Sequence, residues 1–200
     1  MSINIIGITG PSGAGKSFVC TYLAKRNIPV INADEVYHSL LKKDSPCTLA
    51  LAKAFGDEIL SAEGTPDRKK LGGIVFSSDE KLELLNSIVL KFVIDEINEM
   101  IVKLAASGKE NVVVDAPTLI ESGFSADCDS VISILAPKEE RIKRICERDG
   151  ITRERATLRI EAQKSDEFYI NNSHHILIND TDEAAFYKKA EALFNLLIKE

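Results

Sequence analysis

The chain has 200 residues, 44% of them hydrophobic, which is enough to bury the core of one globular α/β domain. Its formal net charge of −6 argues against a broad nucleic-acid-binding face, because such faces carry a basic excess. No apolar run approaches the ~20 residues that cross a bilayer, so we expect no membrane partner, and the N-terminus lacks the pattern of a secretory signal. Four cysteines without metal-binding spacing fit a reducing cytoplasm, where we expect the protein to work.

The first predicted element is a strand over residues 3–8, and a glycine-rich loop follows it. This loop, Gly10 to Ser17, fits the phosphate-binding pattern Gly-x-x-x-x-Gly-Lys-[Ser/Thr] at every fixed position. Backbone N–H groups of such a loop, and the start of the helix predicted over 18–26, bind phosphate oxygens. We expect Lys16 to reach the β- and γ-phosphates and the Ser17 hydroxyl to bind Mg²⁺. A glycine-rich turn that only joins a strand to a helix is the alternative. The predicted nucleotide contacts here are Gly10, Ser12, Gly13, Ala14, Gly15, Lys16, Ser17 and Phe18.

A short second strand, predicted at residues 30–31, is followed by Asn32-Ala33-Asp34. Because the carboxyl ends of strands in open α/β sheets face the ligand crevice, Asp34 should lie near the phosphates. We interpret Asp34 as a general base, since phosphoryl transfer to a hydroxyl needs a carboxylate to accept its proton. The alternative role for Asp34 is the N-cap of the next helix. His38, one helical turn further on, either binds an acceptor phosphate or is a surface histidine.

Between residues 34 and 108 the pattern predicts only helices. The last of them is long, with apolar residues at helical spacing, and Gly108 is a plausible end. We interpret this helical insertion as an arm that binds the phosphoryl acceptor. The predicted helices cover residues 35–43, 49–55, 68–76 and 79–107.

The third strand, predicted over residues 111–115, contains a continuous valine run that suits a parallel sheet covered on both faces. It ends at Asp115, where P-loop proteins often place a carboxylate near Mg²⁺; a strand-ending turn residue is the alternative. Further strands are predicted over 130–135 and 176–179. Five strands separated by helical connections predict a five-stranded parallel sheet in a three-layer α/β fold. The later helices are predicted over 137–148, 152–164 and 182–199.

Positive charge is concentrated in residues 138–164, which hold nine Lys or Arg against six Asp or Glu. Arg141, Arg144 and Arg148 share one side of a helix. Guanidinium groups bind phosphoryl oxygens, and an arginine that closes over the transferring group stabilises its developing charge. A solvated helix face is the alternative. Gly150 would permit a hinged lid that excludes water from the reaction.

Several motifs occur in a recognisable order along nearly the whole chain. They are Gly10 to Ser17, Ala33-Asp34, Arg68-Lys69-Lys70-Leu71 with Phe76, Leu85-Asn86, Pro117 with Leu119 and Glu121, Arg144-x-x-x-Arg148-Asp149, Gln163 and Asn179. In their order and spacing these motifs resemble those of the dephospho-coenzyme A kinase family.

The resemblance implies a P-loop kinase fold and the use of ATP and Mg²⁺ to phosphorylate the ribose 3′-hydroxyl of dephospho-coenzyme A. It makes Asp34 the catalytic base, together with Lys16 and Arg144 as catalytic residues, and divides a single domain into a core, an acceptor arm and a lid. The implied core covers about 1–33, 109–137 and 168–200, the arm about 34–108, and the lid about 138–167. The implied further nucleotide contacts are Arg144, Arg148 and Asn179, and the implied acceptor contacts are Asp34, His38, Arg68, Pro117, Leu119 and Glu121.

The chain departs from the family pattern at several positions. Asn32 replaces the first Asp of Asp-Ala-Asp, Leu90-Lys91 replaces His-Pro, and Thr118 interrupts Pro-Leu-Leu. His174 and Thr181 replace the residues that usually flank the last strand. Two alternatives therefore stay open: another small-molecule P-loop kinase that acts on a nucleoside or nucleotide, and a non-catalytic nucleotide-binding protein. The sequence does not give an oligomeric state.

Overall fold

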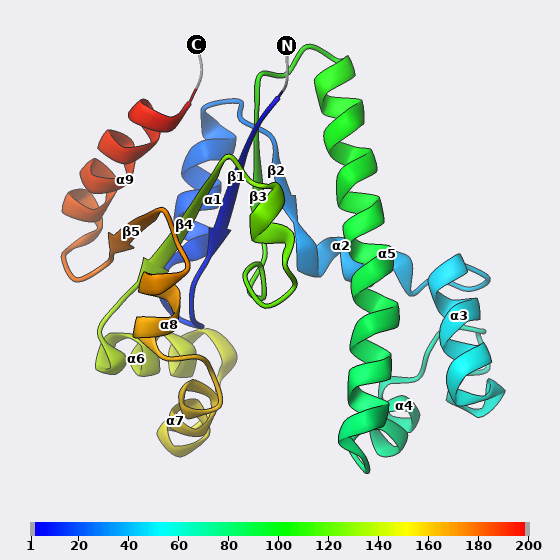
Figure 1. The fold of residues 1–200 in the computed structure, drawn as a ribbon. Helices are drawn as coiled ribbons and strands as arrows, with labels where there is room; N and C mark the ends of the chain where they lie inside the picture. The colour runs from blue at the N-terminus through cyan, green and yellow to red at the C-terminus, as the bar shows by residue number, and fades with distance from the viewer. Residues whose placement is uncertain (1–2, 199–200) are drawn as a thin grey trace. The chain divides into compact units, whose positions relative to one another are not determined.

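The structure, a computed structural model, describes residues 3–198, which form two compact units (Figure 1). One unit consists of the residues up to 31 and from 103 onward, and the other of residues 32–102. Within the described range, no helix has both the length and the apolar character needed to cross a membrane.

A five-stranded parallel sheet is the framework of the first unit. Its strands, in the spatial order β2-β3-β1-β4-β5, are β1 (Asn4–Thr9), β2 (Val30–Asn32), β3 (Asn111–Asp115), β4 (Ser130–Leu135) and β5 (His175–Ile178). The parallel register places Ile6 of β1 opposite Val113 on one side and Ser130 on the other. Because parallel strands end at the same edge, the segments after β1, β3, β4 and β5 meet there. The predicted parallel α/β sheet is therefore confirmed.

Helices α1 (Lys16–Lys25) and α9 (Glu183–Leu197) cover one face of the sheet (Figure 1). Leu23 of α1 and Phe186 and Phe194 of α9 pack with Ile6 and Ile8 of β1 in one buried cluster. On the opposite face, Leu119 lies so close to Gly7 that an added Cβ at Gly7 would stand 2.5 Å from it. The 3₁₀-helix η2 (Phe124–Asp127) follows on this face. Burial of the sheet on both faces agrees with the predicted three layers.

Three helices occupy the region after β4. α6 (Lys138–Asp149) and α7 (Arg153–Glu161) pack together through Ile142, Ile145, Ala156 and Ile160. Thr152 caps α7 as the sequence indicates, its hydroxyl accepting the Arg155 N–H. The predicted helix over 152–164 is too long, because α7 ends at Glu161. A separate helix, α8 (Asp166–Asn171), follows, and Ser165 caps it by accepting the Phe168 N–H.

The second unit is helical, as predicted. It contains α2 (Ala33–Leu40), α3 (Pro46–Phe55), the 3₁₀-helix η1 (Asp57–Ile59), α4 (Arg68–Val75) and most of α5 (Asp79–Ala106). Its own core gathers side chains from α3, η1 and α4, including Leu51, Ile59 and Leu71. The predicted end of the long helix is confirmed, because Gly108 has a φ of 82° just beyond α5. The last helix ends at Leu197, and residue 199, where it was predicted to end, lies outside the described residues.

We expect Gly10→Ala to destabilise the protein strongly, because Gly10 has a φ of 131° and an added Cβ would stand 2.2 Å from the Ile134 carbonyl oxygen. Strain and overpacking together predict a loss of about 2–5 kcal/mol in the free energy of unfolding. Gly123→Ala is the matched control, since Gly123 also has a positive φ of 80° but its Cβ would meet nothing within 4 Å. That control should lose only about 1–2 kcal/mol. Urea unfolding measures both, and equal losses would contradict the packing argument.

Candidate functional site

The glycines of the phosphate loop are required by how closely the loop packs on the protein. Gly10, Gly13 and Gly15 have φ values of 131°, 79° and 111°, a region that side-chain-bearing residues rarely adopt. Added Cβ atoms there would stand 2.2 Å from the Ile134 oxygen, 2.8 Å from the Arg141 oxygen and 2.4 Å from Asn179 Nδ2, respectively. Elements β4 and α6 and the residue after β5 therefore hold this loop from behind.

The loop presents positive charge at the start of α1. Gly15, the N-cap, has no side chain to satisfy the first N–H groups of the helix, and the first turn contains no acidic residue. Such a helix start favours an anion. The Lys16 ammonium donates to the Gly10 oxygen at 2.6 Å and to the Pro11 oxygen at 3.4 Å, so it lies along the loop. This arrangement is suited to binding phosphate groups.

A buried hydrogen-bond network holds the outer turn of the loop. Arg141 Nε donates to the Ser12 oxygen at 3.0 Å. Gln163 Oε1 accepts from both the Ser12 N–H and Arg141 Nη2, each at 3.1 Å. Arg141 is only 4% exposed, and its Nη1 lies 3.6 Å from Asp166 Oδ1. Burial lowers the pKa of the Arg141 guanidinium and the Asp166 carboxylate opposes this. Arg141 thus positions the outer turn of the loop at Ser12.

Arg144 and Asn179 contact the part of the loop that follows Ser12, at Gly13 and Ala14. Arg144 Nη1 donates to the Gly13 oxygen at 3.2 Å and to the Ala14 oxygen at 3.5 Å. Its Nη2 donates to Asn179 Oδ1 at 3.4 Å, and Asn179 Nδ2 donates to the Ala14 oxygen at 2.9 Å. The structure therefore brings both of these predicted nucleotide contacts to the loop, where they bind its carbonyl groups.

Arg148, by contrast, is bound to its sequence neighbour. Its Nε and Nη2 donate to the two carboxylate oxygens of Asp149 at 2.7 and 3.0 Å, and Arg159 also contacts this carboxylate. These hydrogen bonds, that from Arg148 foremost, lower the pKa of Asp149 to about 2. The Arg148 side chain is 58% exposed. The structure does not bring Arg148 to the loop in the way that it brings Arg144.

Asp115, the predicted metal-linked carboxylate, is buried at the end of β3. Cys20 lies one helical turn after Lys16, on the side of α1 that faces this carboxylate. Burial, then the Asp115 charge, raises the pKa of the Cys20 thiol, while Lys16 lowers it. Lys16, Cys20 and Asp115 therefore lie near one another. The sequence analysis missed Cys20, although its spacing of four from Lys16 on a helix was a usable signal.

The metal assignment depends on oxygen donors alone. Across residues 3–198 no three His, Cys, Asp or Glu side chains are grouped so as to hold a metal ion. The Ser17 hydroxyl and the Asp115 carboxylate are nevertheless the donor types that Mg²⁺ takes, because this ion usually adds substrate phosphates and waters to one or two protein oxygens. These residues fit a Mg²⁺ ion that is bound together with a nucleotide.

The segment after β3 contains three predicted acceptor contacts in different surroundings. The Pro117 oxygen accepts from Thr9 Oγ1 at 3.1 Å, which ties this segment to the end of β1. Leu119 is fully buried, whereas Glu121 is exposed. Burial, then the charge of Glu121, raises the pKa of Tyr169 to about 12, and Arg141 opposes this. Glu121 therefore lies near the buried phenol of α8.

Asp34 stands at the start of α2 with an exposed side chain. Asn32 is the N-cap of this helix, because its Oδ1 accepts from the N–H groups of Asp34 at 2.9 Å and Glu35 at 3.1 Å. The alternative that Asp34 is the N-cap is therefore wrong. The departure at Asn32 has a structural use, since an amide oxygen caps a helix as well as a carboxylate does.

His38 and Arg68, separated by thirty positions in sequence, meet within the helical unit. Arg68 Nη2 lies 2.9 Å from His38 Nδ1. A guanidinium has only donors, so the histidine nitrogen accepts. Burial raises the pKa of the adjacent Tyr37, and the Arg68 charge opposes this. Two predicted acceptor contacts thus lie together, one helical turn from Asp34.

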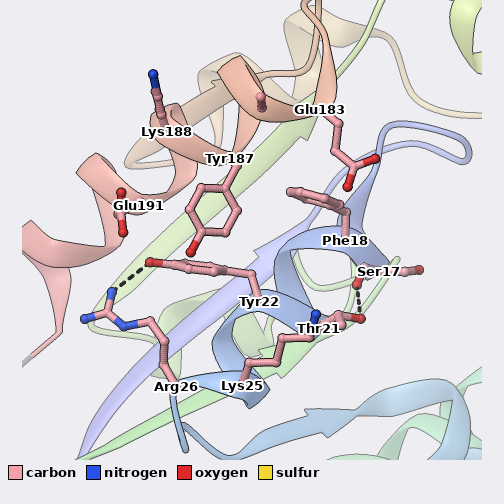
Figure 2. A pocket seen from close by; sticks show the side chains of 11 residues that line it. Ser17, Phe18, Thr21, Tyr22, Lys25, Arg26, Glu183, Tyr187, Lys188 and Glu191 are labelled. Atoms are coloured by element: carbon pink, nitrogen blue, oxygen red, sulfur yellow. Dashed lines mark hydrogen bonds between the residues drawn. The ribbon is translucent and has the colours of Figure 1, made fainter.

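A groove of about 1110 Å³ lies between α1 and α9 and begins at Ser17 and Phe18 (Figure 2). Tyr22 and Tyr187 meet edge to face inside it, with ring centroids 4.9 Å apart. Arg26 Nη1 donates to the Tyr22 hydroxyl at 2.8 Å. The groove provides space beside the end of the phosphate loop. Sequence reasoning missed it, because it is made by helices at opposite ends of the chain.

Comparisons with known proteins match nearly the whole chain to one family. The family model described as dephospho-CoA kinase matches residues 4–185. A curated dephospho-CoA kinase from Fusobacterium nucleatum is 37% identical over 191 residues, which are 96% of this chain and 97% of that protein.

Two solved structures have a similar fold. A dephospho-CoA kinase from Campylobacter jejuni has a TM-score of 0.71 and 27% identity, with 96% of each chain covered. The protein TT1252 from Thermus thermophilus has a TM-score of 0.83 and 28% identity, and the match covers 100% of both chains.

We expect Arg141→Met to lower the free energy of unfolding by about 2–3 kcal/mol, because Ser12 and Gln163 lose a buried charged donor. The KM for ATP should rise as the loop loses its position. Arg153→Met, which removes an exposed pair with Glu139, is the control and should change stability by less than about 1 kcal/mol. Urea unfolding and ADP release measure these effects. Equal responses of the two variants would show that the Ser12 network does not position the loop.

Tyr169 gives a pH dependence at the alkaline end. Its pKa is raised in the folded state from 10.0 to about 12, so its contribution to stability is complete below pH 10.0 and is lost as the pH rises through about 12. In a titration followed by tyrosinate absorbance, one step should therefore appear near pH 12. Tyr169→Phe should remove that step, and Tyr187→Phe should leave it in place. Persistence of the step in Tyr169→Phe would contradict the assignment.

Proposed function

The chain belongs to the dephospho-CoA kinase family, and we propose that it transfers the γ-phosphoryl group of ATP to the ribose 3′-hydroxyl of dephospho-CoA, giving CoA and ADP. The observation that carries this proposal is the family match over residues 4–185, which includes the phosphate loop, Asp34 and Arg144. We place the reaction in the cytoplasm, which the four free cysteines support.

The phosphate loop holds ATP in this proposal. The N–H groups at the start of α1 bind phosphate oxygens, and Lys16 moves from the Gly10 and Pro11 carbonyl oxygens to the β- and γ-phosphates. The nucleoside end lies beside Phe18, with Asn179 nearby. The Ser12 network and the contacts of Arg144 with Gly13 and Ala14 support this role, because they fix the loop before the nucleotide binds.

Ser17 and Asp115 hold Mg²⁺ through oxygen atoms in this proposal, and the ion, when bound, neutralises charge on the phosphates. The Lys16 ammonium and the N–H groups at the start of α1 stabilise the same negative charge on the phosphates. The Cys20 thiol, whose pKa is raised by burial and then by the Asp115 charge, lies beside this carboxylate at the end of β3. Oxygen donors beside a phosphate-binding helix start are the observation that supports this site.

Asp34 accepts the proton of the 3′-hydroxyl as the oxygen attacks the γ-phosphorus. Its side chain is exposed, and the helix is capped by Asn32, so the carboxylate is not used as a cap. Its place two residues after the end of β2 supports an approach to the phosphates, because that strand ends at the ligand edge of the sheet.

The remaining predicted residues serve the acceptor and the lid. Residues 34–108 act as the acceptor arm, in which His38 and Arg68 bind acceptor phosphate. Pro117 and Glu121 border the acceptor from the core, while the buried Leu119 packs beside Gly7 and holds that segment in place. Residues 138–167 act as the lid. When the lid closes, Arg144 leaves the Gly13 and Ala14 oxygens to lie over the transferring group and stabilise its charge, and Arg148 follows. The pairing of His38 with Arg68 supports the acceptor role.

We expect Asp34→Asn to retain ATP binding and to lower turnover of dephospho-CoA by about 10²–10⁴-fold, because the amide cannot accept the hydroxyl proton. ADP release measures turnover, and calorimetry measures ATP binding. Glu35→Gln is the matched control on the neighbouring residue and should keep wild-type turnover. Turnover of Asp34→Asn at the wild-type rate would remove Asp34 from the base role. Absence of acceptor-dependent ADP release from the wild type would reject the proposed function itself.

A further inference from the structure

A groove of about 510 Å³ runs along the exposed side of α4. Its lining comes from the helix and the two residues after it, so it lies wholly within the helical unit of residues 32–102. The lining residues are Arg68, Lys69, Gly72, Gly73, Phe76 and Ser77.

The two ends of this α4 groove differ in chemistry. Arg68 and Lys69 give its beginning two positive charges. The first N–H groups of α4 are capped by the Asp67 carboxylate, so these two side chains are what this end offers to an anion. Phe76 stands at the other end with 80% of its surface exposed. Eight positions of helix separate Arg68 from Phe76, which corresponds to ~12 Å. The groove therefore offers a cationic end and an aromatic end, joined by a stretch of bare backbone.

That bare backbone consists of Gly72 and Gly73, which lie inside α4 with helical φ angles. Glycine is a less stable choice than alanine inside a helix. A Cβ at Gly72 would stand 3.3 Å from the Phe76 ring, so Gly72 lets that ring pack over it. A Cβ at Gly73 would meet nothing within 4 Å, so internal packing does not require glycine there. What Gly73 provides is room above the helix backbone.

The cationic end of the groove adjoins the proposed acceptor contacts. Arg68 is bound to His38, and His38 lies one helical turn after Asp34 on α2. The helical unit thus presents three features in order. They are the Asp34 carboxylate, the positive charges of Arg68 and Lys69, and the α4 groove that ends at Phe76.

We propose that the α4 groove binds the pantetheine arm of the acceptor, with Arg68 and Lys69 on its diphosphate. The inference rests on the proposed function, and it names which part of the acceptor each part of this unit holds. Dephospho-CoA carries a 3′-hydroxyl, then a diphosphate with two negative charges, then a long uncharged arm with a gem-dimethyl group. This order matches Asp34, Arg68 and Phe76.

The length of the pantetheine arm, compared with the length of the α4 groove, favours the arm over the adenine ring as the group bound there. The arm has twelve chain atoms beyond the diphosphate, equal to about four extended residues or ~13 Å. It therefore reaches from Arg68 to Phe76. The adenine ring is attached to the ribose, on the other side of the diphosphate from the arm. The methylenes beside the thiol give the far end of the arm an apolar surface to place on the open face of Phe76.

The test compares two inhibitors that each resemble half of the acceptor. At saturating ATP, 4′-phosphopantetheine and adenosine 5′-phosphate are assayed as competitors of dephospho-CoA on the wild type and on Phe76→Ala. The loss of apolar contact should weaken 4′-phosphopantetheine and raise the KM for dephospho-CoA by about 10-fold or more. Inhibition by adenosine 5′-phosphate should stay within about twofold, because it has no arm. Leu196→Ala, which truncates an 83%-exposed residue of α9, is the control and should change neither.

Gly73→Leu tests the room above the backbone. It fills the groove, so the KM for dephospho-CoA should rise by about 10-fold while the melting temperature stays equal to or above that of the wild type. If Gly73 had only a structural role, Gly73→Leu would lower both the melting temperature and the activity.

Three results would overturn the inference. The first is equal inhibition of the wild type and Phe76→Ala by 4′-phosphopantetheine, including no inhibition of either. The second is a weakening confined to adenosine 5′-phosphate, which would place the base at Phe76. The third is an unchanged KM in Gly73→Leu. A wild type that releases ADP on addition of dephospho-CoA keeps the proposed function intact under each of these results, so the two failures are distinguishable.

Discussion

The phosphate loop depends on hydrogen bonds that hold its carbonyl groups from the protein side. A glycine-rich loop exposes its N–H groups to a ligand only if its backbone is fixed in place, because an unfixed loop would lose entropy on binding. Here the oxygens of Ser12 and Ala14 are bound by Arg141 and Asn179, respectively. The donors come from α6 and from the residue after β5, so the conformation of the loop depends on parts of the chain that are distant in sequence.

The three arginines at spacings of three and four on α6 show how one helix side can do different work. Arg141 is buried and binds Ser12, Arg144 binds Gly13 and Ala14, and Arg148 is drawn away by Asp149. Their surroundings differ because the helix passes the loop only along its first two turns. A basic stripe in the sequence is therefore not a uniform surface. Position along the helix decides which arginine supports the loop.

Much of the fold could be predicted because its signals are local. The phosphate loop, the valine run of β3 and the glycine after α5 each lie within a few residues of the feature that they specify. The burial of Arg141, the proximity of Cys20 to Asp115 and the α4 groove could not be read in this way, because each depends on tertiary packing. Asn32 was also a local signal, because asparagine is a common helix N-cap. The sequence analysis treated it only as the loss of a family carboxylate. The comparisons do not test individual site residues, so the role of Asp34 stays a prediction.

The position of Lys16 has a consequence for which anions the loop selects. Its ammonium already has two carbonyl partners, the oxygens of Gly10 and Pro11. A ligand that binds the Lys16 ammonium must therefore displace these carbonyl oxygens from it. A singly charged ion gains little from such an exchange, whereas a polyphosphate offers several charged oxygens at once and more than repays the two that are released. If Lys16 binds phosphate as we propose, we therefore expect the loop to favour multiply charged anions over singly charged ones.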